Sequence, residues 1–284
     1  MFSSVVFFSE SQIRGKVDRT FPNARNDIAW SIMMDADWCP YGEVPQKKYE
    51  LGIVTIPKTK PNINFEGLKK YCDKIAVMQE GPHWYFQDYS VEEQFQFIEN
   101  LRSADWVYCH NESDKPYYVG LGCKDVRVMR TLMLPEGLDS KRYSSDKKGI
   151  ILGGNFTSWY SGLDSYLIAH AVNEPITNVS MGRKQEQEDM IPDIKYLPYM
   201  TWREWINECG KYKVGIHMMR THAAGTFSLN LAYHGTPCLG YKGLDTQELL
   251  HPQTTVEVGD IIGAQKILKK LYEDKFFYHE CSEQ

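Results

Sequence analysis

Short apolar runs alternate along the chain with stretches in which apolar residues recur at helical spacing. Runs of about four to eight apolar residues are typical of buried strands, and apolar residues at every third or fourth position are typical of amphipathic helices. Strand-like runs lie at 4–8, 51–56, 74–79, 105–109 and, less regularly, 126–134. Helical stretches lie at 28–35 and 92–102, the latter with an apolar side of Phe95, Phe97, Ile98 and Leu101. This alternation predicts a parallel sheet with helices on both faces.

A polar segment without periodicity, residues 135–148, separates this series from a second one. Its proline, glycine and charged residues are typical of a linker. After it, strand-like runs at 149–152, 178–181, 214–218 and 236–241 alternate with helical stretches at 163–172, 202–209, 228–233 and 261–272. We therefore expect two α/β domains, 1–140 and 148–270, and a final segment, 271–284, that crosses back to the first domain.

Composition narrows the class of protein. The 284 residues are 42% hydrophobic and 24% charged, which suits globular domains with real cores. No apolar run approaches the roughly 20 residues that a membrane helix needs, and the N-terminus lacks the features of a signal peptide. The seven cysteines have no Cys-x-x-Cys spacing, which favours reduced thiols over disulfides or a zinc site. We expect a cytoplasmic protein without a membrane partner.

The formal net charge of −5 argues against strong non-specific affinity for nucleic acids, which requires a broad basic surface. A local basic groove is still compatible with it. The densest basic stretch, 14–25, follows the first predicted strand and contains Arg14, Lys16 and Arg19. Such a loop could contact DNA phosphates or a diphosphate, and the alternative is an ordinary solvated loop.

Two glycines, Gly153 and Gly154, lie between a predicted strand and a predicted helix. Glycines at this position let backbone N–H groups approach a phosphate, and the N-terminus of the following helix adds a favourable dipole. The alternative is a plain turn from strand to helix. We favour the ligand-binding interpretation for Gly153, Gly154 and Asn155.

A second loop of this kind follows the strand at 214–218. It supplies a cation, hydroxyl groups and helix N–H groups at one point, a combination that suits a diphosphate. Asn230, one helical turn further, could hydrogen-bond a ribose. The alternative is a helix N-terminus with solvated polar residues. The candidate donor-binding residues of this region are Arg220, His222, Gly225, Thr226, Phe227, Ser228 and Asn230.

The run NLAYHGTP, residues 230–237, resembles the pattern E-A-x-A-x-G-T-P of glycosyltransferases with the two-domain GT-B fold. The resemblance implies two Rossmann-like domains whose parallel sheets face each other across a cleft. Asn230 replaces the acidic residue that holds the donor ribose in that family, and His222 replaces the first acidic residue of many retaining members. The segment IILGGNFTS, 150–158, resembles the strand and turn that meet the donor diphosphate. The segment YLPYMT, 196–201, resembles the one near the donor base, which places Tyr199 and Met200 near uracil.

The segment KIAVMQEGPHW, 74–84, resembles the phage DNA glucosyltransferases, which attach sugar to 5-hydroxymethylcytosine. In their inverting member an acidic residue directly after the matching strand is the base, and Glu80 stands at that position. The segment ADWVYCHN, 104–111, resembles the A-D-x-x-x-x-H strand of the same group. A carboxylate at the end of a strand is also a chemically suitable base for an acceptor hydroxyl; the alternative for Glu80 is a cap of a turn or helix. The acceptor-side candidates are Arg14, Lys16, Arg19, His83, Trp84 and His110, with Asp88 and Asp114 nearby.

We therefore expect an inverting glycosyltransferase that uses a UDP-sugar, with Glu80 as base. Arg220 and helix N–H groups would stabilise the leaving diphosphate, with Mg²⁺ or Mn²⁺ as a further candidate. The favoured acceptor is 5-hydroxymethylcytosine in double-stranded phage DNA, flipped out for reaction in the host cytoplasm. The alternatives are a saccharide or small-molecule acceptor and a nucleotide-sugar-binding protein without transferase activity. A dehydrogenase is disfavoured because the first strand region lacks G-x-G-x-x-G.

Overall fold

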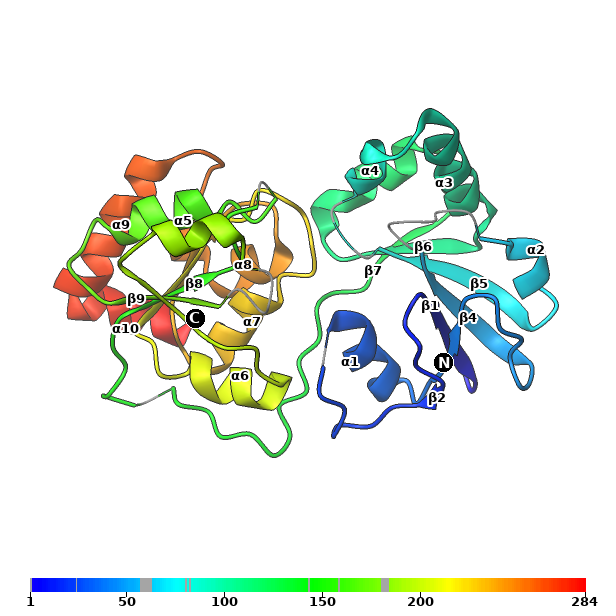
Figure 1. Cartoon of the computed structure of the whole chain (residues 1–284), viewed down its shortest axis with the longest axis horizontal. Helices are drawn as coiled ribbons and strands as arrows, with labels where there is room; N and C mark the ends of the chain where they lie inside the picture. The colour runs from blue at the N-terminus through cyan, green and yellow to red at the C-terminus, as the bar shows by residue number, and fades with distance from the viewer. Residues whose placement is uncertain are drawn as a thin grey trace. The chain divides into compact units, whose positions relative to one another are not determined.

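The computed structural model describes residues 2–23, 25–56, 63–79, 81, 83–142, 144–157, 159–179 and 184–284 (Figure 1). The chain forms two compact units. The first unit contains residues 1–134 together with the short segment His222–Ala224, and the second contains Pro135–Thr221 and Gly225–Gln284. No helix in the described ranges has the length and apolar character that crossing a bilayer requires.

The first unit is built on a seven-stranded sheet with the order β2-β3-β1-β4-β5-β6-β7. Its strands are β1 (Val5–Ser9), β2 (Gly15–Lys16), β3 (Asp37–Pro40), β4 (Tyr49–Thr55), β5 (Cys72–Met78), β6 (Trp106–Cys109) and β7 (Val126–Val128). Its helices are α1 (Asn26–Met33), α2 (Phe65–Leu68), α3 (Val91–Ser103) and α4 (Lys115–Gly120), with 3-10 turns η1 (Tyr85–Asp88) and η2 (Glu112–Asp114). Neighbouring strands are parallel except for the edge strand β2, which runs antiparallel to β3.

Helices cover both faces of this sheet, as the alternation of strands and helices predicts. Successive side chains of a strand point to opposite faces, so Phe7 packs with Ile28 of α1 while Phe8 packs with Leu101 of α3. Figure 1 shows α1 on one side of the sheet and α3 and α4 on the other. The prediction that Phe95 lies on the apolar side of its helix was wrong, since its side chain is 66% exposed.

The second unit is built on a six-stranded parallel sheet with the order β10-β9-β8-β11-β12-β13. Its strands are β8 (Ile150–Gly153), β9 (Ile176–Val179), β10 (Ile194–Tyr196), β11 (Val214–His217), β12 (Cys238–Tyr241) and β13 (Thr255–Val256). Its helices are α5 (Gly162–Ala169), α6 (Trp202–Cys209), α7 (Thr226–Tyr233), α8 (Asp245–Leu250), α9 (Ile261–Glu273) and α10 (Lys275–Glu283), with 3-10 turns η3 (Glu186–Met190) and η4 (Pro252–Thr254).

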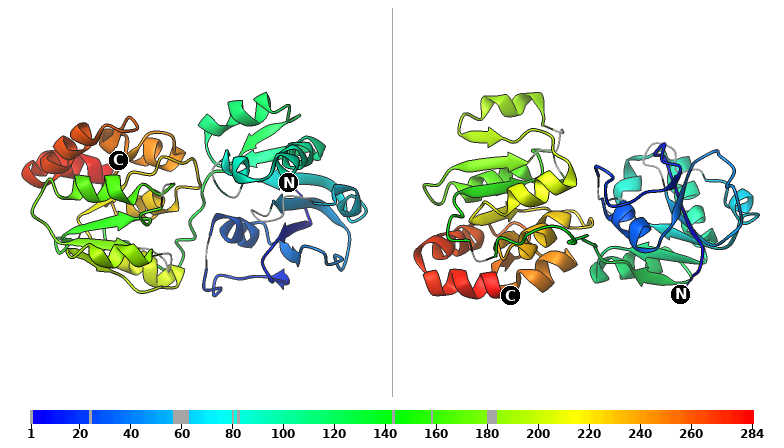
Figure 2. Two further views of the ribbon diagram at one scale, coloured as in Figure 1. Left: turned by 45° about the horizontal axis from the view of Figure 1, so that its top comes forward. Right: turned by 90° about the horizontal axis from the view of Figure 1, so that it is seen from below.

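Two layers of helices enclose the second sheet. One face packs against α5, α9 and α10 (Figure 2). The core between them includes Ile168, Leu268 and Cys281. On the other face α7 approaches β11 so closely that a Cβ on Gly215 would lie 2.1 Å from the Leu231 side chain. The all-parallel sheet with helices on both faces is the Rossmann-like arrangement expected from the sequence.

The strand order of the second unit identifies where a ligand is expected. From β8 the chain builds outward through β9 and β10, and it then returns to place β11 on the other side of β8. The carboxyl ends of β8 and β11 therefore lie at the topological switch point, which is the usual ligand position in sheets of this kind.

Candidate functional site

The two loops singled out in the sequence both leave the sheet at this switch point. The Gly153-Gly154 turn follows β8, and the loop that contains Arg220 follows the adjacent strand β11. The loops are in direct contact, because the Thr221 hydroxyl donates a hydrogen bond to the Trp159 carbonyl oxygen at 3.0 Å. The structure thus brings together the two predicted diphosphate-binding segments within the second unit.

Packing within the protein explains why both positions of the turn are glycines. A Cβ on Gly153 would lie 2.9 Å from ring atoms of His217 and of Phe227. Gly154 has a φ of +78°, in the left-handed region, and a Cβ there would lie 2.9 Å from the Tyr160 side chain. Close packing therefore requires these glycines with or without a ligand.

The helices that follow the two loops begin without side-chain caps. Ser161 precedes α5 with a φ of +50° and Gly225 precedes α7 with a φ of +71°, and neither N-terminus has a side-chain cap hydrogen bond. By contrast, α6 carries a capping box in which Thr201 and Glu204 bond each other's backbone N–H groups. In the described part of the chain, no N-cap side chain accepts from the first-turn N–H groups of α5 and α7, and the helix dipole there favours an anion.

Four buried polar atoms around the turn have no hydrogen-bond partner: Ser161 Oγ, Asn178 Oδ1, Glu188 Oε2 and His217 Nε2. They are all the atoms of this kind in the described part of the second unit. Asn178 and Glu188 hold the turn through their other side-chain atoms, which bond the Gly154 oxygen at 3.0 Å and the Phe156 nitrogen at 3.3 Å. Buried polar groups are normally paired, so this concentration indicates a site that is completed by a polar ligand or by water.

Burial also determines the charge of His217. Removal from solvent lowers the pKa of His217 to about 4, so the ring is neutral at physiological pH. A neutral imidazole with an unpartnered Nε2 can donate or accept one hydrogen bond.

Arg220 is the cation of the candidate site, and it forms an ion pair with Asp164. Its Nη2 lies 2.6 Å from Asp164 Oδ2 on α5, and the Tyr241 hydroxyl donates to the same oxygen at 2.9 Å. The hydrogen bond to Asp164 raises the pKa of Arg220 further, and burial followed by the bond to Asp164 raises the pKa of Tyr241 to about 12. The Arg220 side chain remains half exposed, so the guanidinium can meet a ligand while Asp164 holds it.

The other predicted donor-binding residues lie in α7 and in the loop after β10. Phe227 stacks on Trp205 with ring centroids 5.8 Å apart, and the Ser228 hydroxyl donates to the Gly225 oxygen, so both serve the packing of α7. Thr226 begins α7, and the buried Asn230 lies one turn further in the same helix. The loop 197–200, which follows β10, carries Tyr199, whose side chain is 62% exposed, and the half-buried Met200.

The predicted basic loop of the first unit is charge-compensated. Arg14 forms an ion pair with Glu43, and Lys16 forms one with Asp35. Part of the segment pairs with β3 as the edge strand β2, which the sequence did not predict. Arg19 is half buried in the same loop.

Two further acceptor-side candidates, His110 and Trp84, lie in the first unit. His110 is buried, its Nδ1 lies 3.2 Å from the Asn26 amide nitrogen, and burial lowers its pKa, so it is a neutral residue of the interior. Trp84 is half buried and directly precedes η1. Glu80, the predicted base, lies outside the described residues.

His83 and His222 belong to a cluster in the first unit whose centre is Asp114. Asp114 Oδ1 lies 2.7 Å from His222 Nδ1 and 3.1 Å from His83 Nδ1, and Asp114 Oδ2 accepts from the Asn111 amide at 3.0 Å. Burial alone would raise the pKa of Asp114, but the hydrogen bonds from His222, His83 and Asn111 outweigh it and hold the pKa well below its usual range. Asp114 is therefore a buried, ionised carboxylate.

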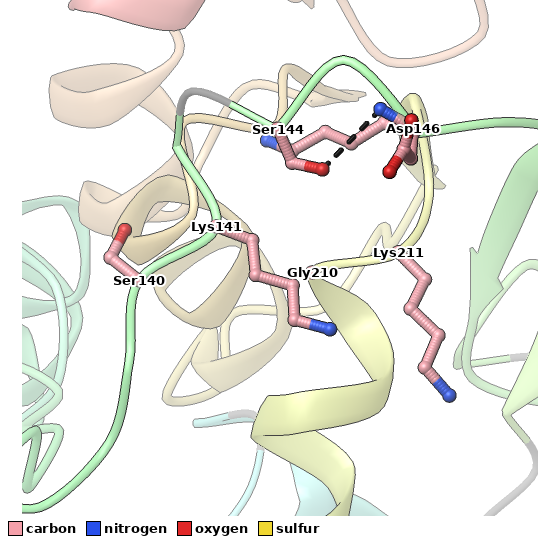
Figure 3. Close-up of a pocket in the computed structure, with 7 residues that line it drawn as sticks. Ser140, Lys141, Ser144, Asp146, Gly210 and Lys211 are labelled. Atoms are coloured by element: carbon pink, nitrogen blue, oxygen red, sulfur yellow. Dashed lines mark hydrogen bonds between the residues drawn. The ribbon is translucent and has the colours of Figure 1, made fainter.

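A pocket of about 440 Å³ in the second unit lies away from this chemistry. Lys141 and Lys211 line it on either side of Gly210 (Figure 3). It adjoins residues 146–147 and 210–211, which precede β8 and β11, and so lies at the amino ends of strands whose carboxyl ends form the switch point. The buried amine of Lys147 in its wall already donates to the His234 carbonyl and to the Thr236 hydroxyl.

The fold has known counterparts. No family model matches the sequence, and no curated protein matches it significantly. Sucrose-phosphate synthase from Thermosynechococcus elongatus superposes with a TM-score of 0.73 at 9% identity, over 98% of this chain and 92% of that one. The chain has the GT-B glycosyltransferase fold.

Two further GT-B structures were solved with nucleotides or sugars. S. aureus TarM, in a complex with UDP, fondaparinux and alpha-GlcNAc-glycerol, matches with a TM-score of 0.62 at 9% identity, over 82% of this chain and 50% of that one. An E. coli trehalose-6-phosphate protein bound with UDP-2-fluoro glucose matches with a TM-score of 0.63 at 10% identity, over 84% of this chain and 69% of that one.

Proposed function

We propose that the chain is a glycosyltransferase that binds a nucleotide sugar, a UDP-sugar, at the switch point of the second unit. The observation that carries this proposal is the pair of uncapped helix N-termini, α5 and α7, at the carboxyl ends of adjacent strands. A diphosphate presents acceptor oxygens and negative charge, which are what these N–H groups and dipoles favour. The GT-B fold supports the proposal, as do the solved neighbours that hold UDP and UDP-2-fluoro glucose.

The donor contacts follow from the chemistry of each group. The diphosphate accepts hydrogen bonds from the first turns of α5 and α7 and pairs with Arg220, which Asp164 orients. Tyr199 stacks on the uracil ring, and Asn230 hydrogen-bonds the ribose. The described residues of the second unit contain no group of three metal-ligating side chains, so N–H groups and Arg220 stabilise the leaving diphosphate in this proposal.

The reaction transfers the sugar to an acceptor hydroxyl. The acceptor oxygen forms a bond to the anomeric carbon, the bond from that carbon to the diphosphate oxygen breaks, and UDP leaves. Glu80 accepts the proton of the acceptor hydroxyl. Direct attack by the acceptor inverts the anomeric carbon, and the configuration of the product, measured by NMR before any hydrolysis, tests this step.

A saccharide or another small polyol is the acceptor that the observations favour. The similar GT-B structures include a sucrose-phosphate synthase and a TarM complex with alpha-GlcNAc-glycerol. Arg14 and Lys16, the cations proposed for DNA phosphates, are paired with Glu43 and Asp35. A DNA acceptor, which depends on phosphate contacts, would require Arg14 and Lys16 to exchange these carboxylate partners for phosphates.

The deciding experiment measures UDP release from a panel of UDP-sugars. Each donor is offered with glucose phosphates, with glycerol-based polyols, with hydroxymethylcytosine-containing duplex DNA, and with unmodified DNA. We expect release that depends on a saccharide or polyol. Release with the hydroxymethylated duplex alone would instead establish the DNA acceptor. Tight UDP binding without turnover on any acceptor would contradict the transferase and favour a nucleotide-sugar-binding protein.

A further inference from the structure

We propose that His83, Asp114 and His222 form a binding site for a transition-metal ion of the Zn²⁺ type in the first unit. The three residues come from the segment before η1, from η2 and from the segment 222–224, all of which belong to that unit. They are the one group of three potential metal ligands among the described residues. The proposal is independent of the transferase reaction.

The distances suit a single ion. The candidate ligand atoms of the three side chains all lie within 4.8 Å of one another, and two of the separations are 2.7 Å and 3.1 Å. Zinc binds nitrogen and oxygen ligands at about 2.0–2.2 Å, so two ligands of one tetrahedral ion lie roughly 3.3 Å apart. Small side-chain movements would place all three atoms around one ion, which would take the place of the hydrogen bonds between Asp114 and the imidazoles.

Neighbouring groups hold the ligands in place. The Asn111 amide occupies Asp114 Oδ2 at 3.0 Å and leaves Oδ1 directed at both histidines. The Tyr117 ring packs against the His83 ring with centroids 4.3 Å apart. A hydrogen bond to the other oxygen of a ligating carboxylate is typical of metal sites.

The backbone of the third ligand is fixed as well. The Gln79 side-chain amide donates to the His222 carbonyl oxygen at 3.2 Å, and the Asn111 amide donates to the Ala223 carbonyl oxygen at 3.1 Å. The segment 222–224 is thus held at two successive carbonyl groups, and a bound ion would add a third attachment.

The ligand set selects the class of metal. Two imidazoles and one carboxylate suit Zn²⁺, Co²⁺ and related ions, whereas Mg²⁺ and Ca²⁺ prefer oxygen ligands alone. Three protein ligands leave one tetrahedral position for water or another small ligand. The histidines are partly exposed, 18% and 28% for the side chains of His83 and His222, while Asp114 is fully buried, so an ion can enter from the imidazole side.

The test uses the full chain after removal of any purification tag and treatment with a chelator. Co²⁺ is added first, because tetrahedral Co²⁺ has a strong visible absorption, and Zn²⁺ is then used to displace it in a calorimetric titration. We expect one ion per chain and an affinity for Zn²⁺ in the micromolar range or tighter. Absence of stoichiometric binding by the unaltered chain would overturn the proposal, and this result depends on no variant.

Variants then locate the ion. His83→Gln, His222→Gln and Asp114→Asn should each weaken binding by tenfold or more. His170→Ala is the matched control, because His170 pairs with Asp193 at 2.9 Å in the second unit and belongs to no group of three ligands. Thermal unfolding of each variant separates loss of the site from loss of the fold. Unchanged affinity in the folded His222→Gln and Asp114→Asn proteins would refute the assignment.

A spectroscopic measurement distinguishes an ion from a hydrogen-bonded network. In nitrogen-15 NMR of labelled histidines, Zn²⁺ should remove the proton from Nδ1 of His83 and His222. If both Nδ1 atoms stay protonated at saturating Zn²⁺, the cluster is a hydrogen-bonded network and the proposal is wrong. Neither outcome bears on UDP release, so failure of this inference and failure of the proposed function are separately visible.

Discussion

Arg220 and Asp164 are joined by two hydrogen bonds, from Nε at 3.2 Å and from Nη2 at 2.6 Å, to the same carboxylate oxygen. Asp164 lies in the first turn of α5, and Arg220 lies in the loop before α7. The pair therefore holds the cation of one loop against the start of the helix that follows the other loop. An arginine held in this way loses little further freedom when it meets a ligand.

Replacing Arg220 by alanine should weaken UDP binding. A charge-assisted hydrogen bond of this kind contributes enough for a loss of about tenfold in affinity. Isothermal titration with UDP measures the change, and Lys266→Ala, which removes an exposed cation of α9 in the same unit, is the control. Equal affinities of Arg220→Ala and the unaltered protein would remove Arg220 from the donor site.

Tyr199→Ala should also weaken UDP binding, by about tenfold, because stacking of a base on an aromatic ring contributes about 1–3 kcal/mol. Stability should not change, since the Tyr199 side chain is 62% exposed. Tyr199→Phe should retain binding. Phe276→Ala provides the matched control, as Phe276 is an exposed aromatic residue of α10. If Tyr199→Ala binds UDP and uridine as well as the unaltered protein, the base lies elsewhere.

Gly225→Ala should destabilise the second unit by about 2–4 kcal/mol, the sum of a strained left-handed backbone and overpacking. Its φ is +71°, and a Cβ would lie 2.1 Å from Thr246 Oγ1. Gly259→Ala is the control, since Gly259 has a φ of +89° but nothing within 4 Å of its Cβ position. Urea denaturation should show a clearly larger loss for Gly225→Ala. Similar losses in both variants would mean that the contact with Thr246 costs nothing.

Acid should destabilise the second unit through its buried histidines. Burial lowers the pKa of His217 and His251 to about 4, below the value of about 6.5 in the unfolded chain. Between these values the unfolded chain binds protons that the folded chain does not. The free energy of unfolding is therefore unaffected by protonation of these two histidines above pH 6.5. It falls as the pH drops toward 4, by up to about 1.4 kcal/mol per pH unit for each histidine.

His217→Leu tests this pH dependence and the ligand site together. Urea denaturation at neutral and mildly acidic pH should show a shallower loss in this variant, because one buried titrating group is gone. His279→Ala, which removes an exposed histidine, should keep the slope of the unaltered protein. We also expect lower UDP affinity for His217→Leu, because the unpartnered Nε2 is lost. An unchanged pH slope would show that His217 titrates alike in both states.

Glu80→Gln should lower turnover by about a hundredfold or more while UDP affinity stays within twofold, because a general base acts on the reaction and not on donor binding. UDP release and UDP titration on the same preparation measure both quantities. Glu43→Gln is the control for loss of a carboxylate in the first unit. Full turnover by Glu80→Gln would assign proton removal to another group.

Much of the fold follows from local patterns. The continuous apolar run at 214–218 forms β11, and the amphipathic stretch at 261–272 forms most of α9, because each pattern determines which side chains can be buried. The strand β3 was missed because its sequence, DWCP, has no apolar alternation and ends in proline. It forms as a neighbour of β1, to which Trp38 and Cys39 pair beside Phe7 and Phe8, and such a pairing is not visible in a four-residue sequence.

The candidate site was predicted only in part, for a similar reason. The glycine turn and the loop at 218–225 are visible because a strand, a glycine and a helix follow one another directly. Asn178, Glu188 and His217 were missed as site residues, because burial and the absence of a partner depend on the whole fold. Asp114 looked like one of several charged residues in a loop, yet it is fully buried beneath two imidazoles.

The grouping of His222–Ala224 with residues 1–134 has a consequence for protein engineering. A fragment that ends at Leu134 would lack the carbonyl groups of His222 and Ala223, which accept from Gln79 and Asn111, and the imidazole that compensates Asp114. The N-terminal unit therefore cannot be exchanged as one continuous segment of the sequence. A chimera that joins this N-terminal unit to another C-terminal unit must supply a histidine at position 222 to keep the contact with Asp114.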